Sequence, residues 1–169
     1  MTPKTASGNP AEGNVEQRGN LSLTSPAFRN GESIAEKYGY TRQNVNPPLQ
    51  IEGVPSNTKS LVLVMDDPDA LVPAGKVWDH WLVWNISPTV HNIPEGWYPI
   101  DAIEGTTDFG KTGYGGPNPP DKKHTYRFKL YALDTRLELP SSSTKREVGK
   151  AMNHHILAQI QLEGTYTPV

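Results

Sequence analysis

Three segments of the 169-residue sequence have residue types that could do binding or acid–base chemistry. The first is DDPDA, Asp66–Ala70, in which three carboxylates lie within four residues at the end of an apolar run. An Asp-Pro-Asp segment also caps its own backbone well, so a purely structural turn is one interpretation. In the functional interpretation, Asp67 and Asp69 lie two residues apart and point the same way into a pocket.

His80 is the second candidate, because it lies in the middle of the apolar segment KVWDHWLVWNI, Lys76–Ile86. A histidine among apolar residues is more often a core residue with satisfied hydrogen bonds than a ligand-binding group. Both nitrogens of a buried imidazole nevertheless need partners. A nearby carboxylate could satisfy one nitrogen and leave the other directed into a cavity.

The glycine- and proline-rich segment GYGGPNPP, Gly113–Pro120, is the third candidate. Its glycines permit positive φ and its prolines fix φ and remove amide donors. Together they predict a stiff wall whose remaining N–H groups face a small ligand. The alternative is a rigid connection between strands. The segment lacks the spacing of a P-loop. His124 and Tyr126 follow it, two residues apart on one face of the next strand.

These groups do not form a recognisable catalytic or metal-binding motif. A metal held by His80, His124, Asp67 and Asp69 is chemically feasible, but nothing in their spacing fixes its geometry. The chain has no cysteine, and no serine lies within the three segments. We therefore predict no metal, no cofactor and no catalytic residues, with a hydrolase that uses the Asp/His cluster as the alternative.

Strands are expected to position these groups. Ser60–Met65 is apolar on both faces, which is typical of a buried central strand. Lys76–Ile86 is interpreted in the same way, and simple alternation places His80 on one face with Leu82 and Trp84. His124–Leu133 alternates between apolar and polar residues, which predicts a third strand.

Shorter strands are predicted near Leu21 and at Leu49–Ile51, and one helix is predicted after Thr144. Thr144 and Glu147 have the spacing of a capping box. After this helix the pattern returns to a period of two from Ile156, which predicts a last strand. With 16 prolines and 15 glycines, the composition favours many turns and a mainly β domain.

The bulk composition excludes several classes of protein. A formal net charge of −2 gives no general attraction to nucleic acid. No apolar run approaches the roughly 20 residues needed to span a bilayer. We expect a soluble, cytoplasmic protein with a disordered polar tail at residues 1–20 and a single domain at residues 21–169.

In this order, the segments resemble the phosphatidylethanolamine-binding protein (PEBP) family, also known as the Raf-kinase-inhibitor-protein family. The residues that carry the resemblance are VMDDPDA (Val64–Ala70), VWDHWLVWNI (Val77–Ile86) and GYGGPNPPDKKHTYRFKLYAL (Gly113–Leu133). The resemblance covers nearly all of the chain after about residue 20. The short loop between DPDA and the tryptophan-rich strand is most similar to the bacterial and archaeal branch.

The resemblance implies a large central antiparallel sheet with a smaller sheet packed on it and a few short peripheral helices. It also implies one small anion-accepting pocket. Carried over to this sequence, the ligand-binding residues are Asp67, Asp69, His80, Gly116, Asn118, Pro119, Pro120, His124 and Tyr126. Leu71 departs from the family, because many members have a proline there.

The function implied is that of a binding protein for a phosphate-bearing or other small anionic head group. Modulation of a partner kinase or protease is a further expectation, and a homodimer is left open.

Overall fold

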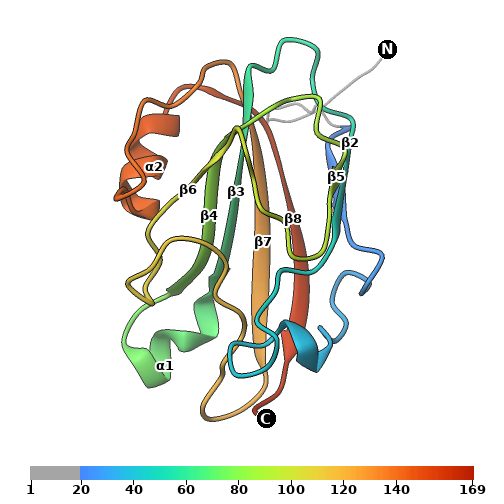
Figure 1. Cartoon of the computed structure of the whole chain (residues 1–169), viewed down its shortest axis with the longest axis vertical. Helices are drawn as coiled ribbons and strands as arrows, with labels where there is room; N and C mark the ends of the chain where they lie inside the picture. Colours follow the sequence, from blue (N-terminus) through green and yellow to red (C-terminus); the bar gives the residue numbers. More distant parts are fainter. Residues whose placement is uncertain (1–19) are drawn as a thin grey trace.

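The computed structural model describes residues 20–169, which form eight strands in two antiparallel sheets and four short helices (Figure 1). Nearly all of the predicted tail at residues 1–20 lies outside this range. In spatial order, the large sheet contains β6 (Ile103–Glu104), β4 (Trp78–Ile86), β3 (Ser60–Asp67), β7 (His124–Leu133) and β8 (Ile156–Tyr166). The small sheet contains β1 (Ser22–Thr24), β2 (Leu49–Glu52) and β5 (Asn92–Ile93). The predicted mainly β architecture is confirmed.

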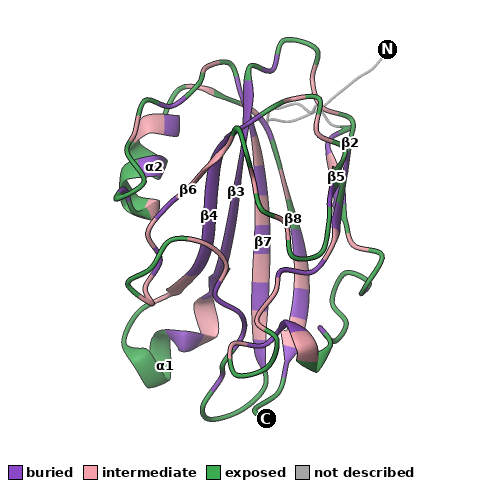
Figure 2. Ribbon diagram, viewed as in Figure 1, coloured by how far each residue is buried: buried purple, intermediate pink, exposed green. Residues whose placement is uncertain are grey.

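The larger hydrophobic core contains side chains from both sheets, including Leu23 and Ile51 from the small sheet and Leu63 and Phe128 from the large one. A second core lies on the other face of the large sheet, where Val148 and other side chains of α2 (Lys145–Met152) cover it. All eight residues of β3 are buried, as expected for a central strand (Figure 2). By contrast, β7 alternates between buried and half-buried residues.

A β-bulge interrupts the pairing of β3 with β4 at His80. Met65 lies opposite Trp81, whereas the next residue, Asp66, lies opposite Asp79. One step along β3 therefore corresponds to two steps along β4, and His80 is the extra residue. An extra residue re-aims the side chains on either side of it, and such bulges are common beside functional sites.

The bulge makes the simple face assignment wrong. Leu82 and Trp84 belong to the core beneath α2. The ring of His80 instead lies 5.2 Å from that of Tyr126 between ring centroids, on the face of the larger core. A second register shift near the other end of β4 includes Asn85, whose φ is +58°.

The predicted helix is present, and its capping box is formed by Thr144 and Glu147. Three short helical segments were not located from the sequence. Directly after β3, the 3-10 helix η2 (Pro68–Ala70) leads into α1 (Leu71–Ala74), with Pro68 at the first helical position. The third, η1 (Glu36–Tyr38), lies before β2. No helix formed by residues 20–169 is long and apolar enough to cross a bilayer.

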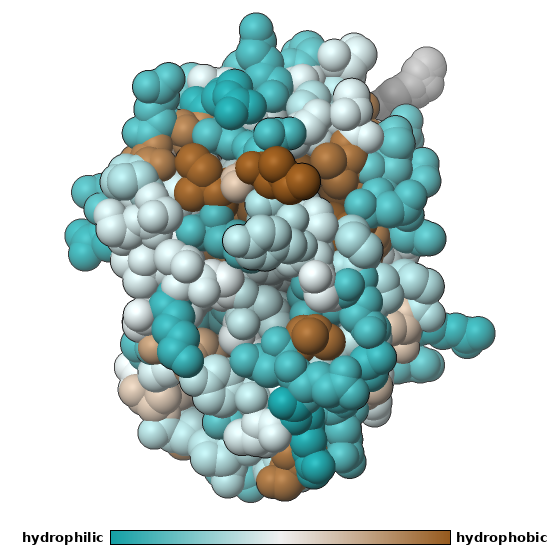
Figure 3. Space-filling model, viewed as in Figure 1, coloured by the Kyte–Doolittle hydropathy of each residue, from teal (hydrophilic) through white to brown (hydrophobic). Residues whose placement is uncertain are grey.

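The view in Figure 3 shows a mainly hydrophilic surface with one band of apolar side chains across its upper half. Large apolar side chains that are exposed include Leu71 and Val72 on α1, and Tyr98 and Ile100 in the connection between β5 and β6.

A cluster of charges lies on the face of the large sheet that α2 covers. The carboxylate of Asp66 is fully buried and accepts hydrogen bonds from Arg127 Nε at 2.7 Å and Lys145 Nζ at 3.0 Å. Lys129 Nζ lies 3.3 Å away, and Lys145 also pairs with Asp79 at 2.7 Å. Burial alone would raise the pKa of Asp66, but the hydrogen bonds from Arg127 and the nearby lysines outweigh it and lower the pKa. The first residue of α2 is thereby tied to the end of β3.

We predict that Asp66→Asn lowers the free energy of unfolding by about 1.5–3 kcal/mol near neutral pH, because it removes the buried charge that Arg127 and Lys145, themselves only partly buried, hydrogen-bond. The pKa of Asp66 is lowered by folding, so its contribution is present above the unfolded-state value of about 3.9 and is lost as the pH falls through the folded-state value. Urea unfolding at several pH values measures both effects.

The matched control is Asp134→Asn. Asp134 pairs with His155, and both side chains are 44% exposed. An exposed ion pair of this kind contributes only about 0–1 kcal/mol. Equal losses of stability in the two variants would contradict a structural role for the buried cluster.

Candidate functional site

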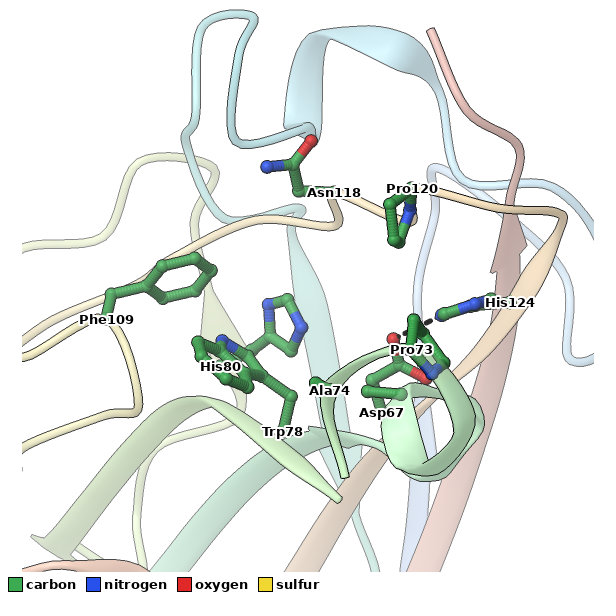
Figure 4. Close-up of a pocket in the computed structure, with 10 residues that line it drawn as sticks. Asp67, Pro73, Ala74, Trp78, His80, Phe109, Asn118, Pro120 and His124 are labelled. Atoms are coloured by element: carbon green, nitrogen blue, oxygen red, sulfur yellow. Dashed lines mark hydrogen bonds and ion pairs between the residues drawn. The ribbon is translucent and has the colours of Figure 1, made fainter. Parts of the chain in front are cut away.

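A cavity of about 190 Å³ opens at the end of the large sheet where β3 ends and β4 and β7 begin (Figure 4). Because these neighbouring strands are antiparallel, the end of one and the beginnings of the other two meet at one edge. Loops and the short helix α1 complete the lining. The lining residues are Asp67, Ala70, Pro73, Ala74, Trp78, His80, Phe109, Asn118, Pro120 and His124.

His124 forms a buried ion pair at one side of this cavity. Its Nδ1 lies 2.6 Å from Asp67 Oδ2, and its Nε2 lies 2.7 Å from Asp121 Oδ1. With a carboxylate at each nitrogen, the ring can donate in both directions only as imidazolium. Burial would lower the pKa of His124, but the hydrogen bonds to Asp67 and Asp121 outweigh it and raise the pKa. This stabilisation is complete below the unfolded-state pKa of about 6.5 and is lost as the pH rises through the folded-state value.

His80 has a different environment, although it lines the same cavity. Its side chain is 2% exposed, and its Nδ1 lies 2.7 Å from the carbonyl oxygen of Gly115. A carbonyl only accepts, so Nδ1 must carry the proton. Burial lowers the pKa of His80, against smaller raising effects of the Gly115 carbonyl and the Asp67 charge. The ring is therefore neutral near pH 7. Among residues 20–169, the ring forms one hydrogen bond of good geometry, at Nδ1, and none at Nε2. The nearby Gly116 backbone also raises the pKa slightly.

The DDPDA segment forms a self-capped turn, as the structural interpretation of the sequence predicted. Asp67 Oδ1 accepts a hydrogen bond from the backbone N–H of Asp69 at 2.9 Å. Asp69 in turn accepts one from the backbone N–H of Thr125 at 2.8 Å, which ties the turn to the start of β7. Asp67 borders the cavity, whereas Asp69 is not part of the lining.

The glycine–proline segment forms a fixed wall, held mainly by its backbone. Gly115 N–H donates to the carbonyl of His80 at 2.9 Å, and Gly116 N–H donates to Asn44 Oδ1 at 2.7 Å. The carbonyl of Pro117 accepts from Tyr40 N–H at 2.9 Å. The amides of Gly115 and Gly116 are thus occupied by the protein, and this part of the wall offers no free donors of the kind expected from the sequence.

Close approach, more than positive φ, explains the paired glycines. Of the three glycines singled out in this segment, only Gly113 has positive φ, at +94°. A Cβ at Gly116 would overlap the backbone carbonyl oxygen of Tyr38, and one at Gly115 would overlap the ring of Phe109. The wall therefore packs directly against the segment before β2 and against an aromatic ring.

Tyr126 lies beneath the two histidines. Its side chain is fully buried, and its hydroxyl has no hydrogen-bond partner of good geometry among the described residues. Burial raises the pKa of the hydroxyl, and the negative charge of Asp67 raises it further. The phenol is therefore neutral and holds a proton that it can donate.

The structure brings five of the nine predicted site residues to the cavity surface: Asp67, His80, Asn118, Pro120 and His124. The other four, Asp69, Gly116, Pro119 and Tyr126, are not part of the lining. Sequence reasoning missed two aromatic walls, Trp78 and Phe109, whose rings lie 5.7 Å apart, centroid to centroid. Phe109 has no periodic signal because it lies in a loop. Asp121 was also missed, although it directly follows the prolines.

The charged groups beside the cavity are one imidazolium and two carboxylates, so there is no surplus of cations. No lysine or arginine lines it. The imidazolium of His124 is matched by Asp67, and Asp121 adds a negative charge whose side chain is 36% exposed. Within residues 20–169, no three histidine or acidic side chains are arranged to hold a metal ion.

The structure thus defines a two-sheet antiparallel β domain with a small, partly apolar cavity at one end of the large sheet. The family model described as phosphatidylethanolamine-binding protein matches residues 24–167. This chain belongs to that family.

Relatives from archaea and bacteria are similar over most of their length. A UPF0098 protein of Pyrococcus horikoshii is 44% identical over 163 residues, covering 91% of this chain and 80% of the relative. A UPF0098 protein of Chlamydia muridarum is also 44% identical, over 86% of this chain and 98% of the relative.

Solved structures agree with these sequence matches. A PEBP homologue from Chlamydia trachomatis has 43% identity and a TM-score of 0.81, over 86% of this chain and 96% of the other. Escherichia coli YbcL, a member of the mammalian PEBP family, has 33% identity and a TM-score of 0.82, over 89% and 99%. The predicted family and its bacterial and archaeal branch are confirmed.

We predict that the two cavity histidines titrate on opposite sides of the ordinary value of about 6.5. Nuclear magnetic resonance of the imidazole signals should give a raised pKa for His124 and a lowered one for His80. Asp67→Asn should lower the pKa of His124 more than Asp121→Asn does, because Asp67 is nearly buried and its charge is less screened. Equal shifts in the two variants would contradict this assignment.

A second prediction concerns the wall. Gly116→Ala should destabilise the fold by about 1–3 kcal/mol, because the added methyl group meets backbone atoms that cannot move independently. Gly149→Ala is the matched control, since nothing lies within 4 Å of its added Cβ in α2. That variant should be stabilising by about 0.5–1 kcal/mol. Thermal unfolding compares them, and a neutral Gly116→Ala would show that the wall is not fixed.

Proposed function

We propose that this protein binds a small anionic molecule, such as a phosphate-bearing head group, in the cavity at the ends of β3, β4 and β7. The observation that carries the proposal is the environment of His80. Its Nδ1–H is held by the Gly115 carbonyl, its Nε2 forms no hydrogen bond of good geometry within residues 20–169, and the ring lines the cavity with its centroid 5.3 Å from that of Phe109 (Figure 4).

Binding of an anion by this site requires a proton. Neutral His80 presents a lone pair at Nε2, which repels an unprotonated anionic oxygen. If His80 takes up a proton, Nδ1–H keeps its bond to Gly115 and Nε2–H donates to the ligand. A monoanion that retains an acidic hydroxyl can instead donate its own proton to Nε2. Both routes strengthen binding as the pH falls.

The remaining groups suit a small head group. Asn118 is an exposed residue at the edge of the lining, and its amide can both donate and accept. Trp78, Phe109 and Pro120 supply apolar walls that exclude water, which strengthens hydrogen bonds inside the cavity. The ion pair of His124 with Asp67 fixes the opposite side and contributes no unbalanced charge.

A hydrolase that uses the Asp/His cluster remains the alternative. The cavity lining contains no serine, threonine, cysteine or lysine that could act as a nucleophile. Both carboxylates of the turn are occupied as hydrogen-bond acceptors, and His124 is held at both nitrogens. These contacts favour binding over turnover. Modulation of a kinase or protease partner, and a cytoplasmic location, stay predictions.

We predict that sulfate and phosphate bind more tightly as the pH falls from about 8 to about 6, because the pKa of free His80 is lowered and each complex needs one proton. Sulfate does not ionise in this range, so its affinity reports protonation of the protein alone. Calorimetric titration in buffers of different ionisation enthalpy measures the proton uptake directly.

His80→Ala should lower the affinity for both anions by about tenfold to a hundredfold, since a charge-assisted hydrogen bond contributes about 1.5–3 kcal/mol. It should also flatten the pH dependence of the affinity. His155→Ala, a change of the same type on an exposed residue, should leave binding unchanged. Equal affinity of wild type and His80→Ala at every pH would remove His80 from the site. Steady release of phosphate from a phosphate monoester would support the hydrolase instead.

A further inference from the structure

The outer edge of β8 is the feature that the proposed function leaves unexplained. β8 is the last strand of the large sheet, and it pairs with β7 on one side only (Figure 1). It contains 11 residues, whereas the other edge strands, β6, β1 and β5, contain two or three. Short edge strands offer little backbone for pairing, so β8 is the longest exposed edge within residues 20–169.

The hydrogen bonds near its end identify which residues direct their backbone groups outward. Glu163 N–H donates to Asn30 Oδ1, and the Glu163 carbonyl accepts from Gly31 N–H, both at 2.8 Å. Thr165 N–H donates to the carbonyl of Glu32 at 2.9 Å. Since a strand repeats every two residues, Gln159 and Gln161 also direct their N–H and C=O groups outward.

Within residues 20–169, no backbone group pairs with Gln159 or Gln161 as residues 30–34 pair with β8 from Glu163 onward. β1 and the segment that ends at Asn30 line a hollow beside Gln161 without pairing to it. Natural edge strands are usually protected by a lysine, another charged side chain, a proline or a bulge. The segment Ala158–Leu162, with the sequence AQIQL, contains none of these. The register shift at the beginning of β8 lies before it.

This segment is also self-complementary about Ile160, because a glutamine flanks Ile160 on each side. If a second copy lies antiparallel with the two-fold axis at Ile160, Gln159 stands opposite Gln161 of the partner subunit. Both residues direct their backbone groups outward, so each such pair exchanges two hydrogen bonds. The axis generates two pairs, and all the unpaired N–H and C=O groups of these residues become satisfied.

The side chains agree with this arrangement. Gln159 and Gln161 lie on the same face, and each amide both donates and accepts, so like residues can pair without charge repulsion. On the other face, Ile160 borders a hollow that Leu23 and Phe28 also line. Contact of the two Ile160 side chains would add apolar burial there.

We propose that this edge is an interface with a second copy of the chain, in which the two β8 strands pair and the large sheet runs through both subunits. The segment lies away from the candidate site, because Gln159 and Gln161 pair with Tyr131 and Lys129, whereas His124 pairs with Tyr166 at the other end. The dimer therefore leaves the cavity open, and it does not depend on the proposed ligand.

Sedimentation velocity of the full chain over about 10 µM to 1 mM tests the proposal. Wild type should shift from monomer towards dimer with concentration. Gln161→Pro should abolish the shift, because it removes an outward N–H that the monomer does not use. Proline is tolerated at such edge positions. Gln161→Thr is the matched control, since it keeps the N–H and should still dimerise.

Hydrogen exchange distinguishes a dimer formed through this edge from a dimer formed through any other surface. The amides of Gln159 and Gln161 should become protected as concentration rises in wild type and in Gln161→Thr. Monomer at every concentration, a dimer that survives Gln161→Pro, or unchanged exchange at these two amides would each overturn the proposal.

A second variant decides the outcome if Gln161→Pro fails to fold. In Gln159→Lys/Gln161→Lys, lysines would face each other across the axis, and the dimer should be lost at low salt and partly restored at high salt by screening. A salt-independent dimer in this variant would also overturn the proposal.

Discussion

The two-residue period of β3 sends the neighbouring carboxylates Asp66 and Asp67 to opposite faces of the large sheet, and each face has to supply positive charge there. On one face, Arg127 and two lysines surround Asp66, and one of them begins α2. On the other, His124 must stay protonated to balance Asp67. The end of this single strand therefore holds the covering helix α2 through Asp66 and one side of the cavity through Asp67.

The same end of the sheet places two histidines in contrasting states. His124 is held as imidazolium between two carboxylates, whereas His80 is buried against a carbonyl and stays neutral. Between them lies Tyr126, which keeps its proton. The cavity thus combines a fixed ion pair with one ring whose charge can change. A bound molecule could change the protonation of His80 without disturbing the ion pair of His124.

Much of the fold follows from local pattern, because burial and alternation are properties of consecutive residues. β3 and β7 and the capping box of α2 were predicted close to their observed ends. The face of His80 was not, since a bulge depends on how β4 pairs with β3. The partners of Asp66 were also missed, because Lys145 is 79 residues away and no periodic signal connects them. The paired glycines were recognised as special, but close packing against Tyr38 and Phe109 is a tertiary property that the sequence does not display.

The two sides of the cavity differ in how freely they can vary. The wall packs against the backbone of Tyr38 at Gly116 and against the ring of Phe109 at Gly115, so almost any added atom there displaces a packed neighbour. The opposite side is the single turn of α1, where Pro73 and Ala74 reach the cavity while Leu71 and Val72 are exposed to solvent. Replacement of residues in this turn changes the shape of the cavity at little cost to the core. Under the proposed function, this one helical turn is therefore where ligand selectivity could be redesigned.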